Sequence, residues 1–111
     1  MSECSSPLRM YVLIRKDILT DVQCGVQASH AIAWYIRDYI DHDPNLIEWI
    51  WKHHTLIFLA ATEEEIHRKK ILFPSWVGFN EPDIGDIETA VAFSPITSER
   101  GVELFSDLNL I

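Results

Sequence analysis

The sequence predicts a single α/β domain built around a mainly parallel or mixed sheet. Two continuous apolar runs, residues 10–14 and 55–61, are rich in branched and aromatic side chains, which is typical of strands covered on both faces. Helical patterns follow each run, and strands that alternate with helices indicate a layered α/β domain. The chain has 111 residues, 48% hydrophobic and 23% charged, which is enough for one core and hardly for two.

The first residues are expected to form a flexible tail. Residues 1–9 are assigned to this tail and residues 10–111 to the domain. Cys4 falls in the tail and Cys24 on the packed side of a helix, so we do not expect a disulfide between them. The sequence shows neither a secretory signal pattern nor an apolar run near the roughly 20 residues of a membrane helix. We therefore expect a cytoplasmic protein.

A long helix should follow the first strand, which itself should be central in the sheet. Thr20 or Asp21 can cap the start of this helix by accepting a hydrogen bond from an exposed backbone N–H group. The helix then runs from about Val22 to Ile40. It should stop before Pro44, because proline disfavours helical geometry in the residue before it.

The second half of the chain continues the alternation. Residues 46–51 are typical of one or two helical turns before the strand at 55–61. Thr62 and Glu65 have the spacing of a capping box, which predicts a helix over residues 63–70 with an acidic start and a basic end.

Two strands and a helix complete the predicted domain. Residues 75–79 and 89–93 are expected to be strands, connected through a turn at 80–86. After Pro95, the start Thr97-Ser98-Glu99 and the apolar residues behind it predict a short helix.

The charge of the chain is strongly acidic. A net charge of −8 and a pI near 4.9 disfavour nonspecific binding to polyanions, because affinity for phosphates depends on lysine and arginine. Arg15-Lys16 and residues 68–70 nevertheless form two basic clusters. Both clusters also fit an ordinary solvated surface, and the second suits the carboxyl end of a helix.

A polar stripe on the long helix is the candidate site. At about 100° per residue, one narrow face carries Gln23, Gln27, His30, Trp34 and Arg37. A helix that is otherwise apolar is normally buried, so this stripe should face a cleft or the solvent edge. The alternative is an exposed helix edge on which His30 has a local partner.

Other chemistries find little support. No glycine-rich loop follows a strand, which argues against P-loop or dinucleotide binding. His53 and His54 are adjacent and would point to opposite faces of a strand, so they do not indicate a zinc site. Cys24 and His30 lie roughly 120° apart on the helix, which excludes a nucleophilic pair. We expect no cofactor and no metal.

Four blocks of the chain carry a family resemblance. They are RKDI at 15–18, GVQASHA at 25–31, FNEPD at 79–83 and TAVA at 89–92. In this order, over about residues 10–95, the chain resembles the type II peptidyl-tRNA hydrolase family and its small bacterial and phage-type relatives. The resemblance implies a single three-layer domain, in which a four-stranded mixed sheet has helices on both faces, and it implies a homodimer.

The resemblance also implies a site. The helix would contribute Gln27 and His30, the turn after the third strand would contribute Glu81 or its neighbour Asp83 as the acid, and the final strand would contribute Thr89. Where well-studied members carry a lysine, four residues before Gln27, this chain has Gln23. The candidate catalytic residues are therefore Gln23, Gln27, His30, Glu81 and Thr89, and the candidate substrate-binding residues are Arg15, Lys16 and Trp34.

The expected function is hydrolysis of the ester bond of peptidyl-tRNA, which releases peptide and tRNA. The alternative is a catalytically silent dimeric binding or regulatory module on the same fold, which the acidic charge and Gln23 favour. Exposed tryptophans would form the homodimer surface, with Trp34, Trp49, Trp51 and Trp76 as candidates.

Overall fold

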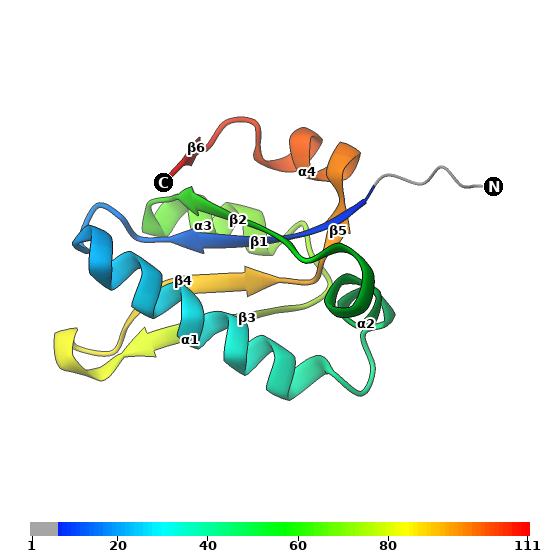
Figure 1. Cartoon of the computed structure of the whole chain (residues 1–111). Coiled ribbons are helices and arrows are strands. Elements are labelled where there is room, and N and C mark those ends of the chain that lie inside the picture. Colours follow the sequence, from blue (N-terminus) through cyan, green and yellow to red (C-terminus); the bar gives the residue numbers. More distant parts are fainter. Residues whose placement is uncertain (1–6) are drawn as a thin grey trace.

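The computed structural model describes residues 7–111, which form an α/β domain around one mixed sheet (Figure 1). Most of the predicted tail, residues 1–6 with Cys4, lies outside the described residues. Its last two residues already belong to the first strand. In chain order the elements are β1 (Leu8–Ile14), α1 (Asp21–Tyr39), α2 (Pro44–Glu48), the π-helical turn η1 (Trp49–His53), β2 (Thr55–Ala60), α3 (Glu63–Lys70), β3 (Trp76–Glu81), the 3₁₀ turn η2 (Pro82–Ile84), β4 (Ile87–Phe93), β5 (Ile96–Thr97), α4 (Ser98–Phe105) and β6 (Asn109–Leu110).

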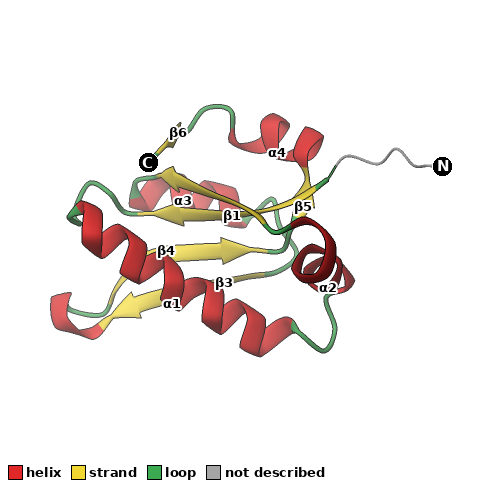
Figure 2. Cartoon of the chain, in the orientation of Figure 1, coloured by secondary structure: helices red, strands yellow, loops and turns green. Residues whose placement is uncertain are grey.

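The strands pair in the order β3-β4-β1-β2-β6, so that β1 is central as predicted (Figure 2). β1 is parallel to β2 and antiparallel to β4, and β3 pairs antiparallel with β4. The expected count of four strands is wrong, because residues 7–111 form six. The additional strands are β5, which pairs with the start of β1, and β6, which pairs with the end of β2. Each has only two residues, which is too short for a periodic pattern.

Neighbouring residues of β1 enter two different cores. Val12 packs with Ala28 of α1 in one core, whereas Leu13 belongs to a second core with Ile66 of α3 and Phe105 of α4. Alternate side chains of a strand point to opposite faces, which explains this division. The small, fully buried Ala28 allows α1 to lie close to the sheet, and α1 crosses the near side of the sheet in Figure 1. The polar stripe of α1 is thereby held at a fixed position above β3 and β4.

The helix starts follow their local sequence. Thr62 caps α3 and forms the predicted capping box with Glu65, and Thr20 caps α1. The helices α2 and η1 together occupy the segment in which one or two turns were predicted. Among residues 7–111, no helix combines the length and the hydropathy that crossing a bilayer requires.

The tryptophans differ in their exposure. Trp49 is buried, and its indole N–H donates to the carbonyl oxygen of Thr55 at 2.7 Å, so its expected exposure is wrong. Trp51, by contrast, is 77% exposed, and Trp76 is exposed at the start of β3. Trp34 is half-buried. The sequence could not separate Trp49 from Trp51, because both lie in one short helical segment.

Candidate functional site

Three predicted site residues from three different elements are joined by hydrogen bonds. The side-chain amide of Gln27 on α1 donates to Glu81 Oε1 at the end of β3, with an Nε2–Oε1 distance of 2.8 Å. The hydroxyl of Thr89 on β4 donates to Gln27 Oε1 at 2.7 Å. Thr89 is 0% exposed and Gln27 5% exposed, whereas Glu81 is half-buried. The structure thus forms a chain of contacts, Thr89–Gln27–Glu81, that leads from the interior toward solvent.

A β-bulge sets the direction of Thr89. Phe79 of β3 pairs with Ala90, but the next residue, Asn80, pairs with Glu88, so that Thr89 is the extra residue of β4. Ala90 belongs to the core beside α1, and regular alternation would turn Thr89 away from it. The bulge instead lets Thr89 point toward α1 as well. Bulges commonly redirect a side chain next to an active site.

Glu81 is the acid that meets the helix. Its Oε2 accepts a hydrogen bond from the backbone N–H of Asp83 at 3.3 Å, while its Oε1 accepts from Gln27. Asp83 itself is exposed in η2. The sequence leaves open whether Glu81 or Asp83 is the acid of the site. The hydrogen bond from Gln27 favours Glu81. Each carboxylate oxygen of Glu81 accepts one hydrogen bond, and the two bonds together fix the orientation of the carboxylate plane.

A row of rings lies beside this group. The imidazole of His30 stacks on Phe79 with a centroid distance of 4.5 Å and an interplanar angle of 10°. Trp34 contacts the same ring edge-on at 4.8 Å, and the guanidinium of Arg37 lies 5.0 Å from the Trp34 ring. His30 and Arg37 are exposed.

Phe79 was not singled out from the sequence, although it holds both rings in place. Its carbonyl oxygen also lies 3.3 Å from Thr89 Oγ1. The available signal was its spacing of two residues from Glu81 on one strand. Phe79 therefore connects the ring row to the Thr89–Gln27–Glu81 chain.

Gln23 serves its own helix rather than this group. Its Oε1 accepts the backbone N–H of Thr20 at 2.9 Å, and its backbone N–H donates to Thr20 Oγ1 at 3.2 Å. These two bonds form the capping box of α1. The Gln23 side chain is thus engaged with Thr20 rather than with Gln27 or Glu81, and its membership of the site stays a prediction.

The two basic residues before α1, Arg15 and Lys16, differ in their burial and in their partners. Arg15 is buried and binds Asp17 through two hydrogen bonds of 2.9 and 3.1 Å. This pairing holds the pKa of Asp17 below its usual value and that of Arg15 above it. Arg15 lines a cavity of about 500 Å³ with Lys70 and Glu88, which are themselves paired, while its backbone N–H donates to the carbonyl oxygen of Thr89 at 2.9 Å. Its place at the rim of the site stays a prediction. Lys16 is exposed.

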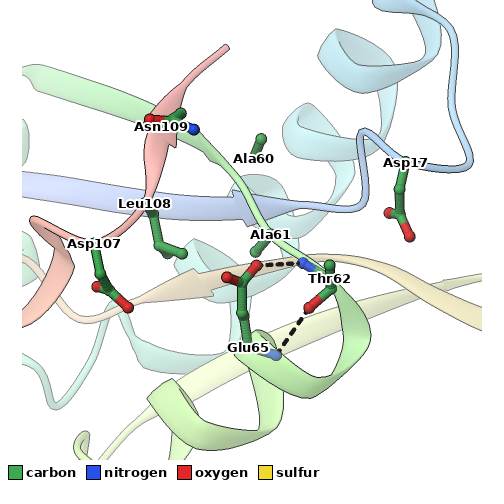
Figure 3. A pocket seen from close by; sticks show the side chains of 8 residues that line it. All are labelled: Asp17, Ala60, Ala61, Thr62, Glu65, Asp107, Leu108 and Asn109. Carbon is green, nitrogen blue, oxygen red and sulfur yellow. Dashed lines mark hydrogen bonds between the residues drawn. The ribbon is translucent and has the colours of Figure 1, made fainter.

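A smaller cavity of about 210 Å³ lies at the carboxyl ends of β1 and β2 (Figure 3). Its carboxylates all have partners: Asp17 binds Arg15, Asp107 binds Lys69 at 2.8 Å, and Glu65 completes the cap of α3. The described residues contain no group of three or more His, Cys, Asp or Glu side chains placed to hold a metal ion. The Thr89–Gln27–Glu81 chain with its ring row is thus the candidate site.

Comparison of the chain with protein-family models and with curated proteins gives no match. The functional assignment therefore depends on the residues of the site and on the resemblance that they carry.

Proposed function

We propose that this protein hydrolyses the ester bond of peptidyl-tRNA at the Thr89–Gln27–Glu81 group. The main support is that Gln27, Glu81 and Thr89, which the resemblance implies as site residues, are joined by hydrogen bonds of 2.8 and 2.7 Å although they come from distant parts of the chain. Further support comes from the bulge at Thr89, which brings its hydroxyl to α1.

In the proposed reaction Glu81 is the general base. Its carboxylate takes a proton from a water molecule, whose oxygen attacks the ester carbonyl. The tetrahedral intermediate then collapses, the bond to the ribose oxygen breaks, and Glu81 returns the proton to that oxygen. The products are a free peptide carboxylate and tRNA with its terminal hydroxyl. His30, exposed beside the group, donates an N–H to the developing oxyanion.

The ring row supplies the proposed binding surface for the tRNA end. Stacking of a nucleobase on an aromatic ring is worth about 1–3 kcal/mol and needs no sequence-specific contact. Trp34 and His30 would provide such a ring surface, with Arg37 at its end. Lys16 is exposed and would contact phosphate, whereas Arg15 is already engaged by Asp17. The net charge of −8 disfavours nonspecific contact with the RNA backbone, so the ring row would have to supply much of the affinity.

The alternative function is a catalytically silent dimeric binding or regulatory module. Gln23 favours this alternative, because a glutamine lacks the charge of the family lysine and because its side chain caps α1. The variant Gln23→Lys separates the two functions. In an enzyme it should raise turnover, provided that the lysine side chain leaves the Thr20 cap and reaches the oxyanion or the phosphate, whereas the silent module should show no turnover before or after the change.

The direct test is turnover of a defined peptidyl-tRNA by purified protein, with free aminoacyl-tRNA as the control substrate. Glu81→Gln and His30→Ala should each lower turnover by about 10²-fold or more. Asp83→Asn is the matched control, because this exposed carboxylate lies two residues from Glu81 and its side chain makes no bond to Gln27. Absence of turnover in the wild type, or equal losses in Glu81→Gln and Asp83→Asn, would contradict the proposed function.

Two features complete the proposal. The packing of α1 in one core and of α3 and α4 in the other supports the three-layer arrangement that the resemblance implies. The exposed Trp51 and its neighbour Ile47, along a groove of about 410 Å³, support association of two copies as a homodimer. The proposed place of action is the cytoplasm, as expected from the sequence.

A further inference from the structure

We propose that Thr89 and Gln27 are positioning residues, which orient the Glu81 carboxylate and do not touch substrate. This inference rests on the proposed function for its catalytic meaning, but the hydrogen-bond chain itself can be tested without turnover. It changes the roles of two residues: of the Thr89–Gln27–Glu81 chain, only Glu81 remains a catalytic residue.

Burial separates the roles. Thr89 has no exposed surface and Gln27 only 5%, and the side chains of both are hydrogen-bonded within the Thr89–Gln27–Glu81 chain, so neither is open to a substrate that approaches from solvent. Glu81 is only half-buried, at the end of β3, so part of its side chain is open to solvent. The member of the chain that can take part in chemistry is therefore the last one.

The number of protons that each side chain can donate fixes the direction of the hydrogen bonds from Thr89 through Gln27 to Glu81. A threonine hydroxyl has one proton, and its shortest contact is Gln27 Oε1 at 2.7 Å, against 3.3 Å to the carbonyl of Phe79. Once Thr89 donates to the amide oxygen, the NH₂ group of Gln27 must face Glu81. The reverse amide orientation would place the Gln27 oxygen against an ionised carboxylate, which is repulsive.

The β-bulge at Thr89 explains why the hydrogen bonds run in this direction. Because Thr89 is the extra residue of β4, its hydroxyl points toward α1 without any change in the side that Ala90 faces. The backbone thus fixes Thr89, Thr89 fixes the amide of Gln27, and Gln27 fixes Glu81 Oε1. The second oxygen is held independently by the N–H of Asp83. A carboxylate held at both oxygens presents a defined lone pair to water, and misplacement of a catalytic group by about 1 Å can cost 10²-fold in rate.

The test compares Thr89→Val with Thr89→Ser and Gln27→Met. Valine keeps the shape of threonine but has no hydroxyl, serine keeps the hydroxyl, and methionine keeps the length of glutamine without its amide. Thr89→Val and Gln27→Met should lower kcat by roughly 10-fold or more with KM within about 2-fold, whereas Thr89→Ser should stay within about 3-fold of wild type. Ser94→Ala is the control, because it removes another buried hydroxyl after β4, one that binds Asp43 instead. It should leave kcat unchanged.

A second readout is independent of activity. In NMR spectra, Thr89→Val should shift the side-chain amide signals of Gln27 and the carboxyl carbon of Glu81, whereas Thr89→Ser and Ser94→Ala should leave both near wild type. If the wild type lacks turnover but these shifts occur, the proposed function fails and the positioning chain stands. Unchanged Gln27 and Glu81 signals in Thr89→Val would overturn the inference, as would a kcat loss that Ser94→Ala reproduces or that Thr89→Ser does not rescue.

Discussion

The buried hydroxyl of Tyr35 offers the sharpest test of how this fold is stabilised. It donates to Asp43 Oδ2 at 2.5 Å, and the Ser94 hydroxyl donates to the same oxygen at 2.8 Å. Ser75 Oγ lies 3.0 Å from the Tyr35 hydroxyl. This cluster ties the end of α1 to the start of α2 and to the residues that flank β3 and β4. Tyr35 is fully buried and Asp43 nearly so, so these bonds are not in competition with water.

The variant Tyr35→Phe keeps the ring and removes only the oxygen. The ring still fills its space and stacks on Tyr39 at 4.6 Å, so no large cavity forms. What is lost is a hydrogen bond to a charged group, which is worth about 1.5–3 kcal/mol, and Asp43 keeps only the donors Ser94 and the N–H of Asn45. The free energy of unfolding should fall by about 2 kcal/mol, which for a domain of this size lowers Tm by roughly 8 °C.

The same hydroxyl makes stability depend on alkaline pH. Burial, and secondly the bond to Asp43, raise the pKa of Tyr35 well above its ordinary value of 10.0. Above that value the unfolded chain loses the proton while the folded chain keeps it, so the free energy of unfolding should decrease as the pH rises beyond 10.0. In Tyr35→Phe this part of the alkaline loss should be absent.

Urea denaturation followed by fluorescence, at neutral pH and again above pH 10, measures both effects. Tyr39→Phe is the matched control: this tyrosine stacks on Tyr35, but its hydroxyl is not part of the Asp43 cluster. It should change stability by no more than about 0.5 kcal/mol. If Tyr35→Phe is as stable as Tyr39→Phe at neutral pH, or loses as much stability as wild type in alkali, the reasoning about the cluster is wrong.

Three further predictions concern two glycines and the association of the chain. Gly25→Ala should raise the free energy of unfolding by about 0.5–1 kcal/mol, because an added Cβ in α1 meets no atom within 4 Å. Gly101→Ala should lower it by about 1–3 kcal/mol, because its Cβ would overlap the Tyr11 ring; equal denaturation midpoints for the two variants would refute the contact. For association, light scattering at micromolar concentration should give a dimer mass for wild type and a monomer mass for Trp51→Gln, and a monomeric wild type would remove the homodimer.

The main elements could be predicted because their signals are local. The apolar run at 10–14 predicts a buried strand wherever its partners come from, and Thr62 with Glu65 predicts the start of α3 from a spacing of three residues. The strands β5 and β6 carry no such signal. Their pairing depends on backbone groups that the rest of the fold brings alongside β1 and β2.

The candidate site could be predicted only in part. The resemblance implies Gln27, Glu81 and Thr89 together, but the bulge that turns Thr89 toward α1 arises from the pairing of two strands and leaves no pattern in the sequence. Gln23 shares the helix stripe of Gln27, yet its side chain accepts the backbone N–H of Thr20 at 2.9 Å. Arg15 likewise pairs with its neighbour Asp17. When a polar side chain has a bonding partner close in sequence, its position along the chain does not predict whether it reaches a distant site.

The central place of β1 has a consequence for synthesis. This strand leaves the ribosome first, but its parallel partner in β2 follows about 45 residues later and its antiparallel partner in β4 about 80 residues later. At roughly 5–20 residues per second, β1 with its apolar run at residues 10–14 waits for several seconds before β2 can pair with it. Pairing of such distant segments also slows folding, since the connecting loop must be closed first. The parallel β1–β2 pair can therefore form before the antiparallel half of the sheet, which is completed only after β4 has been made.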